Sequence, residues 1–204
     1  NSSRLPEQYR RKLAGFGVEV SVERILTSAQ VAARYLAGVA PPDTRVYAIG
    51  GEGVRHALRG RGFVLSDEEA EHVVVGWDQH LTWDKLATAA LLIHRGASFI
   101  GTNPDTSYPT ERGPVPGNGA QLAALEVTTG VAPTVTGKPE RWMIEEGLRR
   151  MGARPETSAL IGDRLDTDIA GGARAGLTTV LLLSGIARES DLASTGKSAS
   201  LEDI

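Results

Sequence analysis

The stretch SALIGDRLDTDIAGGARAG, residues 158–176, joins an apolar run to a cluster of carboxylates and then to a glycine-rich amphipathic segment. The apolar run is typical of a buried strand, and the segment after the acids has a helical pattern. Ligands of open parallel sheets bind beyond the carboxyl ends of the strands, and Asp163 stands at such a position. Asp168 follows in what should be the first turn of the helix, near Asp163 in space. The stretch therefore predicts a strand–helix unit with an acidic functional edge.

Two interpretations of Asp163, Asp166 and Asp168 remain open on these residues alone. A hard cation such as Mg²⁺ prefers carboxylate oxygens, and an acid at a strand end is held rigidly enough to supply one. Negative charge is also favoured at any helix N-terminus, so the three acids could simply stabilise the helix that follows. In either case Asp166 or Thr167 could cap that helix.

A second element, PTVTGKPERW at residues 133–142, places Lys138 between a strand and a helix expected to begin at Pro139. Most lysines are solvated surface charges, but this one should project at the carboxyl edge of the sheet, as Asp163 does. A cation and a metal ligand on one rim suit a phosphate ester, because phosphoryl transfer depends mainly on positioning and charge neutralisation.

The rest of the chain alternates short apolar runs with segments of helical period, the pattern of strand–helix units around a parallel sheet. The strand candidates are residues 45–50, 71–77, 97–101, 133–137, 158–162 and 178–185, and the helix candidates are residues 82–96 and 139–152. In the second helix, Ile144, Leu148 and Met151 lie on one expected apolar face, and Gly152 suits the helix end.

Two segments interrupt this pattern. Residues 37–44, AGVAPPDT, contain a Pro-Pro pair that no helix can cross, so we expect a linker there. Residues 102–119, TNPDTSYPTERGPVPGNG, contain four prolines and three glycines and should form a long loop. Loops of that length inside compact domains are usually functional, although a plain surface excursion is the alternative.

Composition narrows the class of protein. The 204 residues carry a net charge of −3, so no basic excess points to nucleic acid or an anionic membrane surface. The chain has no cysteine, which excludes a disulfide framework, a thiolate zinc site and a cysteine nucleophile. We find neither a signal peptide nor an apolar stretch long enough to span a membrane. We therefore expect a soluble, cytoplasmic protein with no membrane or nucleic-acid partner.

Several motifs together resemble a known family. GKPE at 137–140 and IGDRLDTDIAGGARAGL at 161–177 resemble the third and fourth signatures of the haloacid dehalogenase-like (HAD) phosphatases. Four further segments resemble the NagD-like or p-nitrophenyl phosphatase branch, subfamily IIA, which carries a large α/β cap: NSSR, ILTSAQVAARYL, VYAIGGEGVRHAL and FIGTNPDTSYPTERGPVPGNGAQLAALE. The resemblance covers nearly the whole chain. It implies an α/β fold with a Rossmann-like parallel-sheet core at residues 1–40 and 132–204 and an inserted cap at residues 41–131.

The resemblance also implies roles for residues of the C-terminal part. Lys138 is similar to the lysine that neutralises the phosphate and the nucleophile during catalysis. Asp163 is similar to the catalytic aspartate that binds Mg²⁺. Asp168 matches the further acid of the same signature, which orients the metal shell and is counted with the metal site.

Substrate contacts are implied at two other places. Asn103, Asp105 and Thr106 lie in GTNPDTSYP, which resembles the cap loop that covers the active site and helps to select the substrate. Asn1 and Ser2 resemble the tail of the second signature, a run of polar residues around the phosphate. The branch also makes homodimers formed through the cap an expectation.

The first signature of the family, an Asp-x-Asp-Gly segment with the nucleophile and the general acid/base, does not occur in this sequence. We therefore expect the nucleophile and the first core strand upstream of residue 1, and no phosphatase activity from the 204 residues alone. The expected function is Mg²⁺-dependent hydrolysis of small phosphorylated metabolites through an aspartyl-phosphate.

Two other function classes were weighed. A noncatalytic module that binds a metal or a phosphate compound, without the nucleophile, remains the alternative. A dinucleotide-binding enzyme is not favoured, because IGGEGVRHALRG has His56 where the G-x-G-x-x-G pattern needs its third glycine.

Overall fold

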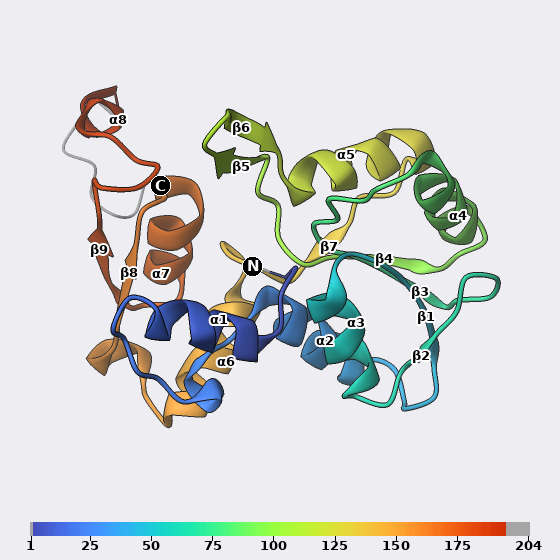
Figure 1. The fold of residues 1–204 in the computed structure, drawn as a ribbon, viewed down its shortest axis with the longest axis horizontal. Helices are drawn as coiled ribbons and strands as arrows, with labels where there is room; N and C mark the ends of the chain where they lie inside the picture. Colours follow the sequence, from blue (N-terminus) through green and yellow to red (C-terminus); the bar gives the residue numbers. More distant parts are fainter. Residues whose placement is uncertain (1, 195–204) are drawn as a thin grey trace. The chain divides into compact units, whose positions relative to one another are not determined.

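The structure, a computed structural model, describes residues 2–194. It is an α/β protein in which the chain divides after Gly137 into two compact units. We call the residues up to Gly137 the N-terminal unit and those from Lys138 the C-terminal unit, and each is described by itself (Figure 1).

The N-terminal unit is built on a five-stranded parallel sheet with strand order β2-β1-β3-β4-β7. The strands are β1 (Arg45–Ile49), β2 (Val64–Leu65), β3 (His72–Val75), β4 (Ser98–Gly101) and β7 (Thr134–Val135). In the central register Tyr47 pairs with Val73, and Val73 pairs with Phe99. The apolar runs that predicted β1, β3, β4 and β7 are confirmed as strands.

Helices cover both faces of this sheet (Figure 1). They are α2 (Ser28–Ala37) and α3 (Glu52–Arg59) on one face, and α4 (Trp83–His94) and α5 (Asn118–Thr129) on the other. The unit also contains α1 (Pro6–Ala14) and a short 3₁₀ turn at Val22–Arg24. Successive strand residues point to opposite faces, so Tyr47 packs with α4 and α5, whereas Val46 packs with α2 and α3. The result is a three-layer sandwich with two apolar cores.

Local signals explain where two of these helices begin. Thr27 caps α2, since its Oγ1 accepts from the N–H of Gln30 and the Gln30 side chain accepts from the N–H of Thr27. Thr82 caps α4 by accepting from the N–H of Lys85. The helix predicted over 82–96 is therefore confirmed as α4.

The loop predicted over residues 102–119 is partly wrong, because the structure contains a hairpin there. β5 (Ser107–Thr110) and β6 (Gly113–Pro116) pair antiparallel, with Pro109 opposite Pro114. Proline cannot donate to a ladder, but a two-stranded ribbon has open edges where a missing N–H costs little. Proline content alone was thus a misleading sign of irregular structure.

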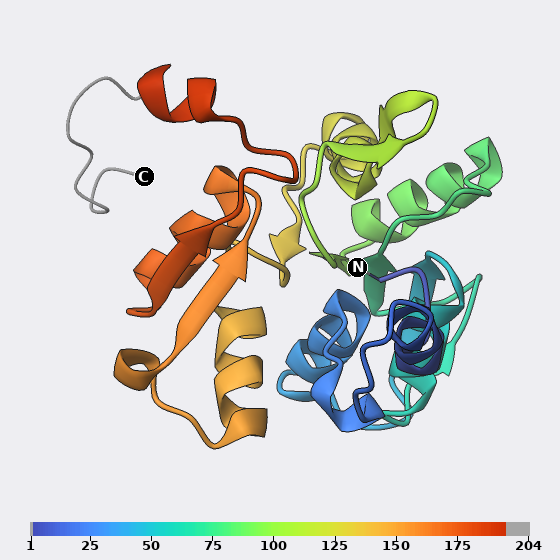
Figure 2. The ribbon, with the colours of Figure 1, turned by 60° about the vertical axis from the view of Figure 1, so that its left-hand side comes forward.

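The C-terminal unit contains a pair of parallel strands, β8 (Ala159–Gly162) and β9 (Thr178–Leu181). Figure 2 shows the two strands side by side, with α7 (Ala170–Arg174) packed against them. A π-helical turn at Leu165–Ile169 leads into α7. The other elements are α6 (Arg141–Met151), a 3₁₀ turn at Pro155–Thr157 and α8 (Glu189–Ser194).

Helix α6 differs from its prediction in its first residue and in the exposure of its last residue. Ile144 and Leu148 are buried as expected, but Met151 is 68% exposed. The helix begins after Glu140, so Pro139 precedes it and does not lie in its first turn. Gly152 ends the helix with a φ of 61°, a conformation that favours glycine, as predicted.

The division between the two expected domains stays a prediction. Helix α2 belongs to the N-terminal unit by its packing, since Leu36 is buried in the same cluster as Val46 and Ile100 of the sheet. As for membrane crossing, the longest helices of residues 2–194 have only 12 residues, and none of the helices there could span a bilayer.

Candidate functional site

Lys138 and Asp168 form an ion pair in the C-terminal unit. The Asp168 side chain is only 4% exposed, whereas the Lys138 side chain is 37% exposed. A buried carboxylate therefore holds the ammonium of a lysine whose side chain remains partly exposed. The two residues are 30 positions apart in the chain, and folding brings them together.

Asp168 also fixes the end of strand β8. Its Oδ2 accepts from the N–H groups of Asp163 and Arg164, each at 3.2 Å, while its Oδ1 contacts Lys138. The Asp168 carboxyl packs so closely on Gly162 that a side chain there would overlap it. One buried carboxylate thus connects the lysine to the loop that carries Asp163.

Asp163 is held from the other side by the segment after β9. Its Oδ2 accepts from the N–H of Ile186 at 3.0 Å, and its carbonyl accepts from the N–H of Ala187 at 2.8 Å. A side chain at Gly185 would overlap the Asp163 carboxyl. Within residues 2–194, no hydrogen bond reaches the second oxygen, Oδ1. This half-buried carboxylate therefore keeps one oxygen available for a cation or a ligand.

Asp166, the third acid of the stretch, has a different environment. It pairs with Arg164 at 2.9 Å, and its side chain is 67% exposed. The hydrogen bond from Arg164 lowers the pKa of Asp166, against the effect of partial burial. The expectation that Asp166 or Thr167 caps the helix is wrong, because no side chain caps the π-helical turn. The three acids thus have three different sets of contacts.

The predicted substrate loop is fixed through its backbone in the N-terminal unit. Asn103 accepts from the N–H of Asp105, and the Asp105 carbonyl accepts from the N–H of Gly119 at 2.8 Å. The N–H of Gly117 donates to the Thr106 carbonyl at 3.0 Å. Side chains at either glycine would overlap the loop backbone. The Thr106 side chain is exposed and that of Asp105 is half-buried.

The other predicted phosphate contacts lie elsewhere in the same unit. Ser2 is fully buried, its Oγ packs at Gly76, and it has no hydrogen-bond partner among residues 2–194. Asn1 lies outside the described residues. The structure brings Lys138, Asp163 and Asp168 together, and their roles and those of the N-terminal residues stay predictions.

Comparison with known proteins identifies the family. Residues 1–64 match the family described as haloacid dehalogenase-like hydrolase, and residues 135–202 match one described as HAD-hydrolase-like. The 5′-nucleotidase YutF of Bacillus subtilis is 40% identical over 188 residues, 92% of this chain and 73% of that protein. The chain belongs to the haloacid dehalogenase-like hydrolases.

Further relatives place this hydrolase among the HAD phosphatases, as expected from its motifs. The acid sugar phosphatase of Staphylococcus aureus is 39% identical over 193 residues, 94% of this chain and 74% of that protein. A crystal structure of a thermostable NPPase from Geobacillus stearothermophilus matches with a TM-score of 0.89 and 41% identity, covering 93% of this chain and 76% of that one. The α/β fold and the family resemblance are therefore confirmed.

A HAD hydrolase implies a divalent metal, and the donor set here fits one in part. A glycerol phosphate phosphatase from Mycobacterium tuberculosis, solved in complex with magnesium, matches with a TM-score of 0.87 and 37% identity, covering 92% of this chain and 57% of that one. In this chain the free Asp163 oxygen is a hard ligand. No group of three potential metal-ligating side chains occurs within residues 2–194. Mg²⁺ often binds through one or two carboxylates, with water and phosphate oxygens completing its shell, so Asp163 suits it.

Sequence reasoning missed the backbone groups that hold these acids. The N–H of Ile186 orients Asp163, and the N–H groups of Asp163 and Arg164 orient Asp168. Such donors leave no side-chain signature. The glycines beside them were the available signal, since Gly162 and Gly185 both lie where another chain segment approaches closely.

Proposed function

We propose that this HAD phosphatase hydrolyses small phosphate monoesters with the help of Mg²⁺. The observation that carries the proposal is the arrangement in the C-terminal unit, where Asp168 positions Lys138 and also anchors the loop of Asp163. The names of the relatives, a 5′-nucleotidase and an acid sugar phosphatase, support phosphorylated metabolites as the substrate class.

In this proposal the two side chains that remain accessible act on the phosphate. The Lys138 ammonium offsets negative charge on the phosphoryl oxygens, which grows important as the ester bond breaks. The free oxygen of Asp163 would hold Mg²⁺, which when bound supplies further charge neutralisation. Asp168 fixes the direction of Lys138, and in this proposal it also orients the metal shell.

The proposed route is covalent. A carboxylate oxygen forms a bond to phosphorus while the ester oxygen leaves with a proton from an acid, and water then hydrolyses the aspartyl-phosphate to inorganic phosphate. The 204 residues contain no Asp-x-Asp-Gly segment, so we assign the nucleophile to a segment outside them. Ile161 and Val180, a pair on one face of β8–β9, are 63% and 42% exposed, so this face of the parallel pair is left uncovered by residues 2–194.

The remaining assignments belong to the same proposal. Asn103, Asp105 and Thr106 would contact the leaving group and so set the substrate preference. Asn1 and Ser2 would contact the phosphate after a rearrangement that exposes Ser2. The proposal also includes a homodimer formed through the cap. It includes a cytoplasmic location as well, with which the absence of cysteine is compatible.

The test compares three variants of the natural protein, including any residues that its gene encodes before Asn1. Hydrolysis of p-nitrophenyl phosphate is followed with and without Mg²⁺. We expect Lys138→Ala and Asp163→Asn to lower turnover by about 10² to 10³, as when other positioned charges are removed. Asp166→Asn is the matched control, because this neighbouring acid points to solvent, and it should retain activity.

Two outcomes would overturn the proposal. Equal activity of parent, Lys138→Ala and Asp163→Asn would remove both residues from the site. Tight binding of a phosphate ester without any turnover, in a protein that includes the upstream residues, would instead favour the noncatalytic binding module.

A further inference from the structure

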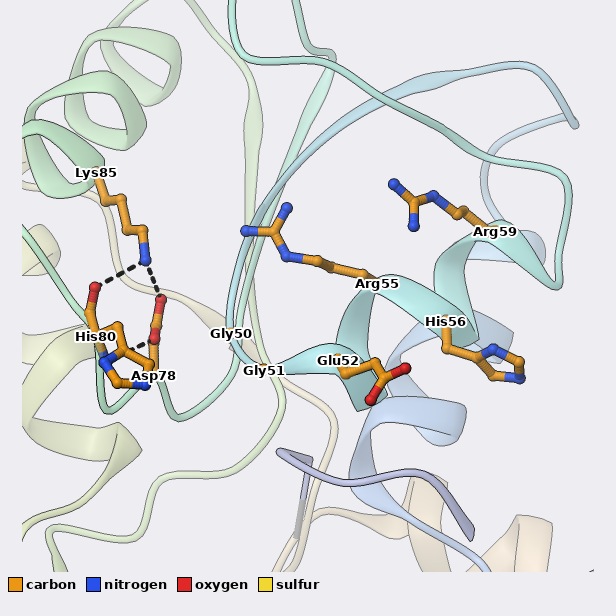
Figure 3. A pocket seen from close by; sticks show the side chains of 9 residues that line it. All are labelled: Gly50, Gly51, Glu52, Arg55, His56, Arg59, Asp78, His80 and Lys85. Atoms are coloured by element: carbon orange, nitrogen blue, oxygen red, sulfur yellow. Dashed lines mark hydrogen bonds and ion pairs between the residues drawn. The ribbon is translucent and has the colours of Figure 1, made fainter. Parts of the chain in front are cut away.

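The N-terminal unit contains a cavity that the proposed function does not use. Its volume is about 380 Å³, within the usual range for small-molecule sites. Gly50 and Gly51, which follow β1, line it, together with Arg55 and Arg59 of α3 and the segment from Asp78 to Lys85 (Figure 3). It therefore lies where parallel strands end, the edge at which open sheets bind ligands.

The lining of this cavity holds three cations, Arg55, Arg59 and Lys85, and two carboxylates, Glu52 and Asp78, so with neutral histidines its net charge is +3 − 2 = +1. Arg55 and Arg59 lie one helical turn apart on α3, and within residues 2–194 neither forms a hydrogen bond or an ion pair. Like charges at this spacing repel each other. Glu52 precedes Arg55 by three residues, a spacing that allows pairing, but Figure 3 shows the two side chains pointing in opposite directions.

Some arginines of the described residues pair with carboxylates, such as Arg45 with Glu69, Arg141 with Glu145 and Arg164 with Asp166. Arg55 and Arg59 have no such partner among residues 2–194, and both line the same cavity. Each guanidinium is a planar fork of donors, so two of them in one cavity suit a multivalent oxyanion.

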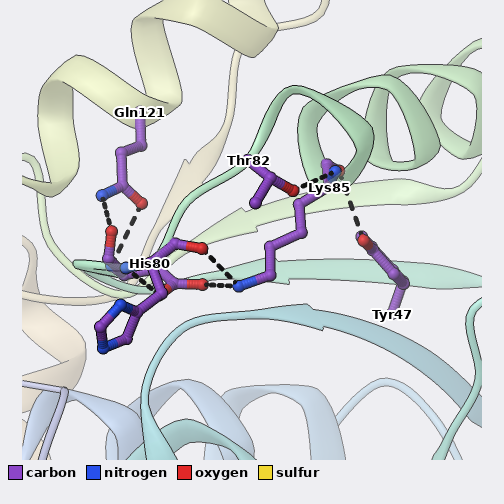
Figure 4. Close-up of polar contacts among 6 residues, drawn as sticks. Tyr47, His80, Thr82, Lys85 and Gln121 are labelled. Atoms are coloured by element: carbon purple, nitrogen blue, oxygen red, sulfur yellow. Dashed lines mark hydrogen bonds and ion pairs between the residues drawn. The ribbon is translucent and has the colours of Figure 1, made fainter.

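The opposite wall is already neutralised and fixed. Lys85 Nζ donates to Asp78 Oδ2 at 2.7 Å and to the His80 carbonyl at 2.8 Å (Figure 4). Asp78 is held through its backbone by Gln121, whose side-chain Nε2 donates to the Asp78 carbonyl at 3.0 Å. The Asp78 charge is thus satisfied within the chain and does not compete for Arg55 or Arg59.

The glycines of the IGGEG segment, residues 49–53, are explained by packing within the chain and not by a ligand in the cavity. Side chains at Gly51 and Gly53 would overlap the backbone of Ser3 and Arg4, which crosses them. Glycine is therefore needed at these positions because another segment of the chain passes close by, and not because a dinucleotide approaches them. Glu52, His56 and His80 also line the cavity, but the unpaired cations in its lining are the two arginines.

We propose that this cavity binds a phosphate-bearing small molecule through Arg55 and Arg59. Each guanidinium donates two N–H groups to phosphate oxygens, and the bound anion removes the repulsion between the two cations. All the residues involved lie between Gly50 and Lys85, so the inference does not depend on the proposed role of Lys138.

The experiment measures binding of inorganic phosphate to the full chain carrying Lys138→Ala, which weakens phosphate contacts near that residue. Arginine Nε–H signals and the backbone amides of residues 50–53 are followed by ¹⁵N NMR, with sodium chloride at equal ionic strength as the reference. We expect saturable shifts at Arg55 and Arg59. In Arg55→Gln/Arg59→Gln, where only the backbone amides of residues 50–53 report binding, the affinity for phosphate should fall by about tenfold or more, about 1.4 kcal/mol.

The matched control is Arg24→Gln/Arg61→Gln, which removes two exposed arginines of the same unit that do not line the cavity. It should bind phosphate as the parent does, and the spectra report whether each variant is folded. An equal loss in both double variants would mean general charge attraction and would overturn the site. Absence of saturable shifts at Arg55 and Arg59 would overturn it as well.

Discussion

The carboxyl of Asp168 fills the space that a side chain at position 162 would need, directly against Gly162. Because the same carboxyl accepts from two backbone N–H groups and pairs with Lys138, it cannot move without changing the whole site. The glycine before Asp163 is therefore as much a part of the site as the acids are.

Gly162→Ala should displace Asp168 and so disturb Lys138. We expect the unfolding free energy to fall by about 1–3 kcal/mol, the usual cost of overpacking, and phosphatase activity to fall with it. Gly147→Ala is the control, because nothing lies within 4 Å of a side chain there, in the middle of α6. That change should leave activity intact and raise stability by about 0.5–1 kcal/mol. Urea denaturation and the p-nitrophenyl phosphate assay measure both effects, and an unchanged Gly162→Ala protein would contradict the prediction.

Asp168→Asn should break the connection between Lys138 and the Asp163 loop. An asparagine oxygen can accept from the two N–H groups, but its amide then turns a donor toward the Lys138 ammonium. We expect a loss of about 1–3 kcal/mol in the unfolding free energy, as for other buried polar groups left unsatisfied. Thermal or urea denaturation against the exposed-site control Asp166→Asn measures it. Equal stability of the two variants would show that the ion pair contributes nothing.

The sequence predicted much of the framework because burial leaves a strong pattern. The runs at 71–77 and 97–101 became β3 and β4, whose Val73, Val74 and Phe99 are buried. The two-residue strand β2 (Val64–Leu65) was missed, whereas the equally short β7 was found inside a run of β-branched residues, Thr134–Thr136. Met151 was wrongly predicted to lie on the buried face, because helical spacing does not show how far along a helix its neighbours extend.

The site was predicted less completely, for a different physical reason. Lys138, Asp163 and Asp168 could be named from their positions at strand ends and from family motifs. The contacts that distinguish them come from backbone N–H groups, which every residue except proline possesses. The cavity beside Arg55 depends on how α3 packs beside residues 78–85, a relation between distant segments that no local pattern records.

The loop at residues 103–106 should influence the choice of substrate without holding the fold together. Asp105→Ala/Thr106→Ala removes the two side chains and leaves the backbone contacts with Gly117 and Gly119. We expect stability to change by no more than about 0.5 kcal/mol, and the ranking among sugar phosphates and nucleotides to change while p-nitrophenyl phosphate is still hydrolysed. Glu111→Ala, in the exposed turn between β5 and β6, is the control. An unaltered ranking of the substrates would mean that the loop has only a structural role.

Asp78 should make the N-terminal unit sensitive to acid. Burial raises the pKa of Asp78, but the hydrogen bond from Lys85 and the N–H of His80 outweigh it, so the pKa lies below its ordinary value of 3.8. A lowered pKa means that the ionised carboxylate stabilises the fold above about pH 4 and that this contribution is lost as the pH falls through the folded-state pKa.

Asp78→Asn should therefore lower the unfolding free energy most at neutral pH, by about 1–3 kcal/mol. Its difference from the parent should shrink as the pH falls below about 4. Urea denaturation across this pH range measures the difference, with the exposed Asp67→Asn as the control. A difference in unfolding free energy that stays constant with pH would contradict the prediction that the ionised carboxylate of Asp78 stabilises the fold.

The paired glycines at 117 and 119 have an evolutionary consequence. They hold the main chain of residues 105 and 106 through hydrogen bonds and close packing, while the Thr106 side chain is exposed and the Asp105 side chain is half-buried. The path of the backbone there does not depend on which side chains these two positions carry. If the proposed contact with the substrate holds, a single codon change at position 106 would alter substrate preference in a descendant of this protein without a loss of stability that has to be offset elsewhere.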